Sequence, residues 1–221
     1  MYIASGDVPT SGPMGPQKKS ESFRPLKTAD VSFHPAIQLP SEYEVYDFTQ
    51  GYDPDRTLSS QYGVGRYDER RPGMYAGEQF QEDQRDIHVG VDIAAPVGEP
   101  VYAFYGGTIF KLGDNALPYD YGPTIITRHR WLEQTVYALH GHLDRSSLTR
   151  WSVGDTFSAG ALLARVGSQS ENGGWNPHLH FQLCLFAPET HDLPGVVCQR
   201  DRLWARAAFP DPRLVLGPLY A

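Results

Sequence analysis

The stretch GGWNPHLHFQL, residues 173–183, contains two histidines that are separated by one residue. Side chains alternate between the two faces of a β-strand, so His178 and His180 would share one face while the apolar Leu179 and Phe181 share the other. A strand face with two imidazoles can bind a metal ion or transfer protons. It can equally be the polar face of a half-exposed sheet, and this pair alone does not separate the two interpretations.

Two further stretches carry residues of the same chemical kind. HVGVD contains His88 and Asp92, and LHGHL contains His140 and His142. Three ligands of mixed imidazole and carboxylate type are what a catalytic zinc ion needs, because they leave a fourth position for water. His88, Asp92 and one histidine of HLH would supply this set. The spacing does not decide which histidine of HLH binds the metal, or whether His140 or His142 enters the site.

The spacing within HVGVD requires a bend in the chain. His88 and Asp92 are four residues apart, which is roughly 13 Å on a straight strand and too far for both to bind one metal ion. A helix would bring them together, but the β-branched residues, glycines and prolines of HVGVDIAAPVGEP disfavour a helix. Gly90 lies midway between them, and a glycine within a strand often marks a bulge or kink. The sequence therefore predicts a bent strand at Gly90.

The histidines that do not bind the metal are candidates for proton transfer. Zinc lowers the pKa of a bound water toward about 7, and an imidazole with a pKa near 6.5 is matched to accept that proton and return it to a leaving amine. The chain has no HExxH motif, which excludes a helix-borne protease site. We expect plain surface roles for the three other histidines of the chain, which are His34, His129 and His191.

These candidate residues lie in a region of short β-rich runs that starts near Arg85. Runs such as EPVYAFYGGTIF, GPTIITRHRW and QTVYALHGHL are separated by turn signals, and helical periodicity is nearly absent. Many short strands at close spacing predict an antiparallel, all-β sandwich or barrel. A short helical segment is expected only in the C-terminal tail, around residues 202–208.

Composition divides the chain into three parts. Residues 1–30 are rich in Pro, Gly, Ser and Lys without periodicity, which predicts a largely irregular, disordered N-terminal arm. Residues 31–84 gain aromatic residues and one short alternation, and we expect an extended segment that wraps the core. Residues 85–221 are expected to form one domain with a C-terminal extension.

Composition also excludes several classes of partner. The chain has 221 residues and a formal net charge of −7, so we expect no binding to nucleic acid. No apolar stretch approaches the roughly 20 residues of a membrane span, and the N-terminus lacks the apolar core of a secretory signal, which favours a cytoplasmic protein. We expect a monomer. Cys184 and Cys198 are too few for a disulfide framework, and we expect two thiols rather than a bridge.

In this order, HVGVD, LHGHL and PHLHF resemble the motifs of zinc metallopeptidases of the lysostaphin and LytM type, peptidase family M23. AAPVGEPVYAFYGGTI and WSVGDTFSAGALLARVGS are also similar to segments of that family. The resemblance covers roughly residues 85–185 and is closest to a subgroup of M23-like proteins that lack a signal peptide. It implies a β-sandwich of the duplicated hybrid motif type that binds one Zn²⁺ per chain.

The resemblance assigns roles that spacing leaves open. By motif position, His88, Asp92 and His180 would hold the zinc ion, and His142 and His178 would be the catalytic imidazoles. The family hydrolyses peptide bonds of bacterial peptidoglycan, often at glycyl or D-amino-acid linkages. We therefore expect a zinc-dependent metalloendopeptidase that acts on a peptide or peptidoglycan substrate.

Two alternatives have the same fold but another function. One is a non-catalytic module that binds wall peptides or a partner protein and keeps the metal as a scaffold. The other is a phosphocarrier with two facing histidines. The phosphocarrier is disfavoured, because the carboxylate of Asp92 would repel a phosphohistidine.

Substrate contacts are expected from one unusual motif position and from two polar loops. The family often has an aromatic residue two positions before the catalytic histidine of its second motif, where this chain has His140. The loops GDNALPYDYGPT and SQSENGGWN offer Tyr119, Tyr121 and Trp175 as surfaces for a peptide, with Asn176 beside them. Trp175 could instead pack its loop onto the sheet. The N-terminal stretch from residue 1 to about residue 75 could fold across this groove and control entry.

Overall fold

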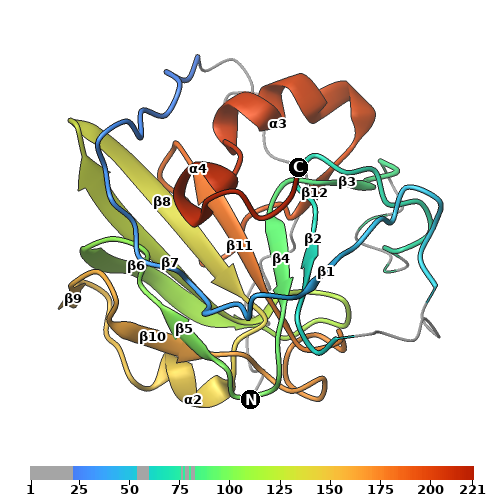
Figure 1. The fold of residues 1–221 in the computed structure, drawn as a ribbon, viewed down its shortest axis with the longest axis horizontal. Helices are drawn as coiled ribbons and strands as arrows, with labels where there is room; N and C mark the ends of the chain where they lie inside the picture. The colour runs from blue at the N-terminus through green and yellow to red at the C-terminus, as the bar shows by residue number, and fades with distance from the viewer. Residues whose placement is uncertain (1–21, 54–59, 76, 78–79, 81–82) are drawn as a thin grey trace, which may run out of the picture.

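The fold is built around one eight-stranded sheet (Figure 1). The computed structural model describes residues 22–53, 60–75, 77, 80 and 83–221. In sheet order the strands are β1 (Glu44–Val45), β2 (Gly63–Gly65), β4 (Val91–Ala94), β11 (His178–Cys184), β8 (Gln134–Gly141), β7 (Gly122–Trp131), β6 (Gly107–Asn115) and β9 (Thr156–Phe157). Neighbouring strands of this sheet are antiparallel, apart from the parallel pair β1 and β2.

Two small sheets and a few short helices complete the described part of the fold. β5 (Pro100–Tyr102) pairs with β10 (Leu162–Arg165), and β3 (Ile87–His88) pairs with β12 (Val196–Val197). The helices are α2 (Arg145–Leu148), the 3-10 helix η2 (Gln199–Asp201), α3 (Arg202–Ala208) and α4 (Arg213–Leu216). α3 forms where the sequence predicts a helical segment in the tail. None of the helices in the described ranges is long and apolar enough to span a membrane.

Strand β11 separates two hydrophobic cores. Its apolar residues Leu179, Phe181 and Leu183 are fully buried in one core, together with Val101 of β5 and Leu163 of β10. The other face of the sheet is covered by α3 and the chain around it, which build a second core. The alternation predicted for β11 is confirmed, and it leaves the histidines on the face opposite the first core.

The N-terminal segment packs against the first core. Leu26 and Ile37 are buried in this core. The indole Nε1 of Trp131 donates a hydrogen bond to the backbone carbonyl of Lys27 at 2.9 Å. The arm predicted to be disordered comprises residues 1–30. Residues 1–21 of it lie outside the described residues. From residue 22 onward, the described chain contacts the rest of the fold.

The prediction of a mostly β fold with few helices is confirmed. The finer prediction, a sandwich of the duplicated hybrid motif type, stays a prediction. Cys184 and Cys198 are both buried, and no disulfide joins them. The thiol of Cys184 donates to the backbone carbonyl of Phe186 at 3.1 Å, which satisfies it inside the second core.

Candidate active site

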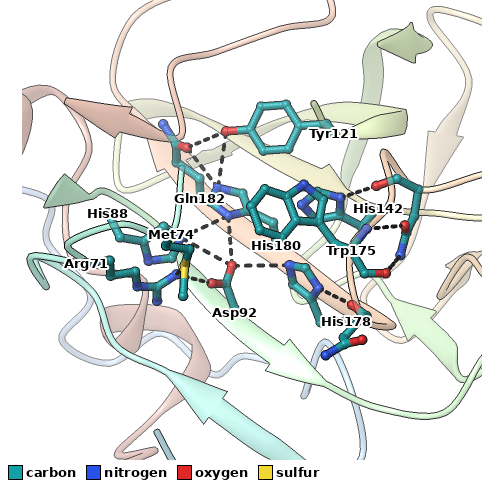
Figure 2. Close-up of polar contacts among 12 residues, drawn as sticks. Arg71, Met74, His88, Asp92, Tyr121, His142, Trp175, His178, His180 and Gln182 are labelled. Carbon is teal, nitrogen blue, oxygen red and sulfur yellow. Dashed lines mark hydrogen bonds and ion pairs between the residues drawn. The ribbon is translucent and has the colours of Figure 1, made fainter. Parts of the chain in front are cut away.

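Strands β4 and β11 place three polar side chains on one face of the sheet. Asp92 of β4 and His180 of β11 are directly paired across the two strands. His178 precedes His180 by two residues and therefore points to the same side. Oδ1 of Asp92 lies 3.0 Å from Nδ1 of His180 and 3.7 Å from Nε2 of His178. Figure 2 shows Asp92 between these two imidazoles and the guanidinium of Arg71.

His88 reaches the same point because its strand is broken at Gly90. β3 ends at His88 and β4 begins at Val91, and the two strands belong to different sheets. Nε2 of His88 therefore lies 3.2 Å from Oδ1 of Asp92. Gly90 also allows a close approach, since a Cβ there would lie 2.5 Å from Cε1 of His180. The bend predicted at Gly90 is confirmed.

Three potential ligand atoms converge on one point: Nε2 of His88, Oδ1 of Asp92 and Nδ1 of His180. Their mutual distances are 3.1, 3.2 and 3.0 Å. Ligands at the corners of a tetrahedron around zinc, with bonds of about 2.0–2.1 Å, lie about 3.3 Å from one another. The three residues therefore fit a zinc ion both in donor type and in spacing, and they leave the fourth corner open.

The ring nitrogens of His88 and His180 that do not face the common point each have a hydrogen-bond partner. Nδ1 of His88 donates to the backbone carbonyl of Arg66 at 3.0 Å. Nε2 of His180 lies 3.0 Å from Oε1 of Gln182, whose amide nitrogen donates to the carbonyl of Pro194 at 3.3 Å. Because these N–H groups are committed, the nitrogens that face the common point carry lone pairs. Three facing acceptors repel one another, and a cation between them removes that repulsion.

His142 and His178 form a second pair of imidazoles beside the ligand atoms. Their ring centroids are 4.3 Å apart. Nδ1 of His142 donates to the carbonyl of Asn172 at 2.8 Å, and Nδ1 of His178 donates to the carbonyl of Asn176 at 2.6 Å. In the neutral rings, Nε2 therefore carries the lone pair that can accept a proton.

The backbone at His142 adopts an unusual conformation. His142 follows the end of β8 with φ +62°, in the left-handed region that residues other than glycine rarely occupy. Its amide donates to the carbonyl of Tyr121 at 2.8 Å, and its carbonyl accepts from the amide of Gly167 at 2.9 Å. Backbone strain of this kind is concentrated at functional sites. Here it directs the ring of His142 toward His178.

Burial sets the protonation states of the site. It lowers the pKa of His88 to about 4, with the nearby charge of Arg71 adding to the effect. It also lowers the pKa of His142 well below its usual range and lowers that of His178. Burial alone would raise the pKa of Asp92, but interactions with His88 and Arg71 hold it well below its usual value. Neutral imidazoles and an ionised carboxylate are the states that a metal ion requires of its ligands.

These residues line a groove of about 510 Å³, and Trp175 forms one of its walls. The ring centroid of Trp175 lies 5.8 Å from that of Tyr119, 6.1 Å from that of Tyr75 and 6.4 Å from that of His142. Tyr119 also lines the groove and is 44% exposed. Trp175 and Tyr119, two of the three aromatic side chains expected at the site, therefore lie next to each other in the groove, while Trp175 also packs against its neighbours.

Tyr121 and Asn176 line the groove as well. The Tyr121 ring is buried, and its hydroxyl lies 3.4 Å from Nε2 of His180 and 3.5 Å from Oε1 of Gln182. Tyr121 therefore contacts the imidazole of the candidate ligand His180. Asn176 bonds to His178 through its backbone carbonyl.

His140 and His129 face away from the groove. In the β8–β11 pairing, Gly141 lies opposite His180 and His140 lies opposite Phe181, so His140 points into the first core. It is fully buried and does not line the groove, which corrects its expected role as a substrate contact. His129, expected at the surface, is 1% exposed and bonds to the hydroxyl of Thr127 at 2.7 Å.

Sequence reasoning missed two residues of this site, Arg71 and Gln182. Alternation in β11 places Gln182 on the face of His178 and His180, which was a usable signal for a supporting role. Nη1 of Arg71 lies 2.6 Å from Oδ2 of Asp92. In the sequence, Arg71 is marked only by the charged run DERR, residues 68–71, and such a run usually lies on a solvated surface.

The sequence model of peptidase family M23 matches residues 86–189, a span that contains all five side chains described above as candidate ligands or proton carriers. The DD-carboxypeptidase/endopeptidase Mpg of Neisseria meningitidis serogroup B is 34% identical over 96 residues, which are 43% of this chain and 20% of that protein. The Mpg protein of Neisseria gonorrhoeae matches to the same extent. The chain therefore spans about a fifth of the length of the curated relatives that it matches.

Two solved structures show a weaker likeness. The catalytic domain of the antimicrobial peptidase lysostaphin from Staphylococcus simulans is 23% identical with a TM-score of 0.44, covering 64% of this chain and 92% of that chain. The catalytic domain of a mutant of the prophage-encoded M23 protein EnpA from Enterococcus faecalis is 24% identical with a TM-score of 0.42 and the same coverage. Both scores lie below 0.5, and we draw no conclusion from them.

Proposed function

Because residues 86–189 belong to peptidase family M23, we propose that this chain is a zinc-dependent metalloendopeptidase that hydrolyses glycyl or D-amino-acid peptide bonds, as in peptidoglycan. The observation that carries the proposal is the convergence of three ligand atoms within 3.2 Å of one another, next to two further neutral imidazoles in one groove. The Neisseria relatives are named DD-carboxypeptidase/endopeptidases, which supports this class of substrate.

His88, Asp92 and His180 are the residues that would hold the zinc ion. When bound, zinc polarises the scissile carbonyl and activates a water molecule. Asp92 would offer Oδ1 to the metal, since Oδ2 accepts a hydrogen bond from Arg71 at 2.6 Å. The two imidazoles are fixed in orientation by the carbonyl of Arg66 and the side chain of Gln182.

His142 and His178 are the residues that would hold and move protons. Each ring donates a hydrogen bond from Nδ1 and leaves the lone pair of Nε2 free to accept a proton. As the water oxygen bonds to the carbonyl carbon, one imidazole accepts the water proton, and it returns this proton to the amine nitrogen when the C–N bond breaks. The other imidazole can donate a hydrogen bond to the oxyanion. The two rings are close enough, at 4.3 Å, to serve one reacting centre.

The groove walls suit an extended peptide. Trp175 and Tyr119 present aromatic surfaces in the groove that contains the candidate site residues. Aromatic walls with a few polar groups are typical of sites that bind a small ligand or a short peptide. A peptide of small residues, such as glycine, can approach such a surface with its backbone.

Zinc content tests the metal site directly. We expect close to one zinc ion per chain in the purified protein, measured by elemental analysis. Asp92→Ala and His180→Ala should lose most of it, because two protein ligands hold zinc poorly against a chelator. Full zinc occupancy in both variants would exclude this ligand assignment.

Hydrolysis tests the reaction. The zinc-loaded chain should cleave pentaglycine or a wall peptide that ends in two D-alanines, with the new amino termini identified by mass spectrometry. Asp92→Ala is the control for contaminating peptidases. Binding of these peptides without cleavage, at full zinc occupancy, would instead favour the non-catalytic module.

A further inference from the structure

Arg71 contacts the candidate metal centre from outside the family-matched residues. Its guanidinium is buried, with 2% of the side chain exposed. Nη1 lies 2.6 Å from Oδ2 of Asp92, and Nε lies 3.0 Å from Oε2 of Glu69. Residues 86–189 match the family model, so this contact comes from a preceding part of the chain. Figure 2 shows Arg71 on the side of Asp92 that faces away from His178.

The segment that carries Arg71 is fixed to the strand that carries His88. The amide of His88 donates to the carbonyl of Glu69 at 2.9 Å, and the amide of Asp68 donates to the carbonyl of His88 at 2.9 Å. The amide of Arg71 donates to the carbonyl of Asp86 at 2.7 Å. Since the backbone is held on both sides of His88, the guanidinium has a defined position relative to the ligands.

The neighbouring strand β2 leaves space for the guanidinium. Gly65 of β2 is paired with Asp92. A Cβ on Gly65 would lie 2.8 Å from Nη2 of Arg71 and 3.3 Å from Oδ2 of Asp92. The carbonyl of the next residue, Arg66, accepts from both Nδ1 of His88 and Nη2 of Arg71, at 3.0 and 3.2 Å. One short segment therefore contacts two of the three candidate ligands.

We propose that Arg71 is a positioning residue of the metal centre, which holds the Asp92 carboxylate so that Oδ1 alone faces the metal. The inference rests on the zinc site proposed above. Groups that orient metal ligands typically change metal affinity or activity by 10- to 100-fold when they are removed. Without Arg71, Asp92 could rotate about its side-chain torsions, and its second oxygen would lose its buried partner.

Glu69 allows the positively charged Arg71 to lie next to a site for a positively charged metal ion. A lone guanidinium this close to the ligands would repel a metal ion. The carboxylate of Glu69, 3% exposed, compensates that charge at 3.0 Å. The planar guanidinium reaches Glu69, Asp92 and the Arg66 carbonyl at the same time, whereas the single ammonium of a lysine cannot match this geometry.

A purely structural role is the competing explanation. Arg71 also lies 3.3 Å from the hydroxyl of Tyr75 and 5.0 Å from the ring centroid of Phe48, so it could simply attach its segment to the core. The two roles differ in what they change. A structural role lowers the stability of the metal-free protein, whereas a positioning role lowers the zinc affinity of the folded protein.

The experiment compares Arg71→Met and Arg71→Lys with Arg70→Met in the full-length chain. Arg70 is the matched control, because its side chain is 68% exposed and pairs only with Asp86 among the interactions of the described residues. Zinc affinity is measured by competition with a chelator of known affinity, under conditions where circular dichroism shows each variant to be folded. Thermal unfolding is recorded separately on the metal-free proteins.

We expect both Arg71 variants to lose roughly 10- to 100-fold in zinc affinity, while Arg70→Met retains the wild-type affinity. If Arg71→Met fails to fold, Arg71→Lys carries the test. An Arg71 variant that unfolds at a lower temperature but binds zinc as tightly as Arg70→Met overturns the proposal. If the wild-type chain binds no zinc, the proposed function is wrong as well. This outcome differs from one in which the wild type binds zinc and only the role of Arg71 is wrong.

Discussion

His178 and His180 lie two residues apart on one strand, yet their hydrogen-bond partners leave different ring nitrogens facing the candidate site. Nδ1 of His178 is committed to a backbone carbonyl, and its Nε2 is the nitrogen left for proton transfer. The reverse holds for His180, whose Nε2 is bonded to Gln182 and whose Nδ1 faces Asp92. The hydrogen-bond partner of each ring, rather than the residue type, therefore distinguishes the proposed proton carrier from the proposed metal ligand.

Removing the proton carriers should separate metal binding from hydrolysis. We expect His142→Ala and His178→Ala to keep their zinc and to lose hydrolysis by about 100-fold or more each, because general acid–base groups contribute rate enhancements of this order. Steady-state cleavage of a glycyl peptide and elemental analysis of the same samples measure both quantities. Wild-type turnover in the two variants would place the chemistry elsewhere.

The buried histidines His140 and His129 should make the fold less stable in mild acid. Burial lowers the pKa of His140 to about 4 and that of His129 to about 3, below the value of about 6.5 in an unfolded chain. Between pH 6.5 and about 4, the unfolded chain therefore binds protons that the folded chain does not, and folding stability falls as the pH falls. His140→Leu should weaken this dependence between pH 7 and 5.

Urea unfolding of the chelator-treated protein at several pH values measures this effect. The wild type and His140→Leu share every other titrating group, so the difference between their pH dependences reports on His140. Parallel curves would contradict the assignment of a strongly lowered pKa to this side chain.

Residue types predicted the candidate ligands up to the choice between His178 and His180, which the family resemblance made, but they did not predict every residue around these ligands. HVGVD and HLH carry donor atoms that suit zinc, and this could be recognised from the sequence. The inward direction of His129 could also have been deduced, because its neighbours Arg128 and Arg130 are the exposed positions of β7. Arg71 could not be predicted, since its contact with Asp92 depends on how a separate segment packs.

At the scale of elements, the break between β3 and β4 brings the site together. A continuous strand through Gly90 would hold His88 and Asp92 far apart, whereas the change of sheet at this point brings their ligand atoms to 3.2 Å. The glycine signalled this break in the sequence. Other local features gave no signal: Leu132 and Glu133 form the β7–β8 turn with positive φ, without the Asn-Gly pair that such turns favour.

Gly90→Ala should displace His180 and weaken the site. Its Cβ would lie 2.5 Å from Cε1 and 2.6 Å from Nε2 of His180, and 2.9 Å from the carbonyl of Phe181. Overpacking of this kind costs about 1–3 kcal/mol, so we expect a loss of that size in the free energy of unfolding, with lower zinc affinity. Gly106→Ala is the matched control, because its nearest contact would be an ordinary 3.6 Å.

Chemical denaturation and zinc titration of both glycine variants provide the measurement. Gly106→Ala should retain the zinc affinity of the wild type. If Gly90→Ala behaves in the same way, the close approach of the chain to His180 is not needed for the site.

At the scale of the whole molecule, the family-matched residues share their hydrophobic core with residues that precede them. Ile37 and Val64 lie in the same core as the strands of the matched region. β2 pairs with β4 and places Gly65 directly opposite Asp92. Composition distinguished residues 31–84 by their aromatic residues, but it could not show which side chains enter the core, because that depends on long-range packing.

A chain that begins at residue 83 should therefore be strongly destabilised. It would lose Leu26, Ile37 and Val64 from the core, and burial of each such side chain contributes about 1.5–3 kcal/mol. Their combined loss is comparable to the roughly 5–15 kcal/mol that stabilises a typical domain. Thermal unfolding and zinc binding of the truncated chain measure the effect.

The control is a chain that begins at residue 22, which retains every described residue. It should unfold at the same temperature as the full chain. Its rate and preference on glycyl and D-alanyl peptides also test whether the predicted arm controls entry to the groove. If the chain from residue 83 is as stable as this control, the N-terminal segment does not contribute to the core as described.

The left-handed backbone at His142 also limits how this position can change over many generations. Any other residue that replaces His142 inherits φ +62°, which costs most residues roughly 1–2 kcal/mol and costs glycine almost nothing. If selection for hydrolysis ended, glycine or asparagine would become the replacement favoured by stability alone. A descendant with glycine at this position and intact zinc ligands would therefore be recognisable, from its sequence, as a metal-binding protein that has given up catalysis.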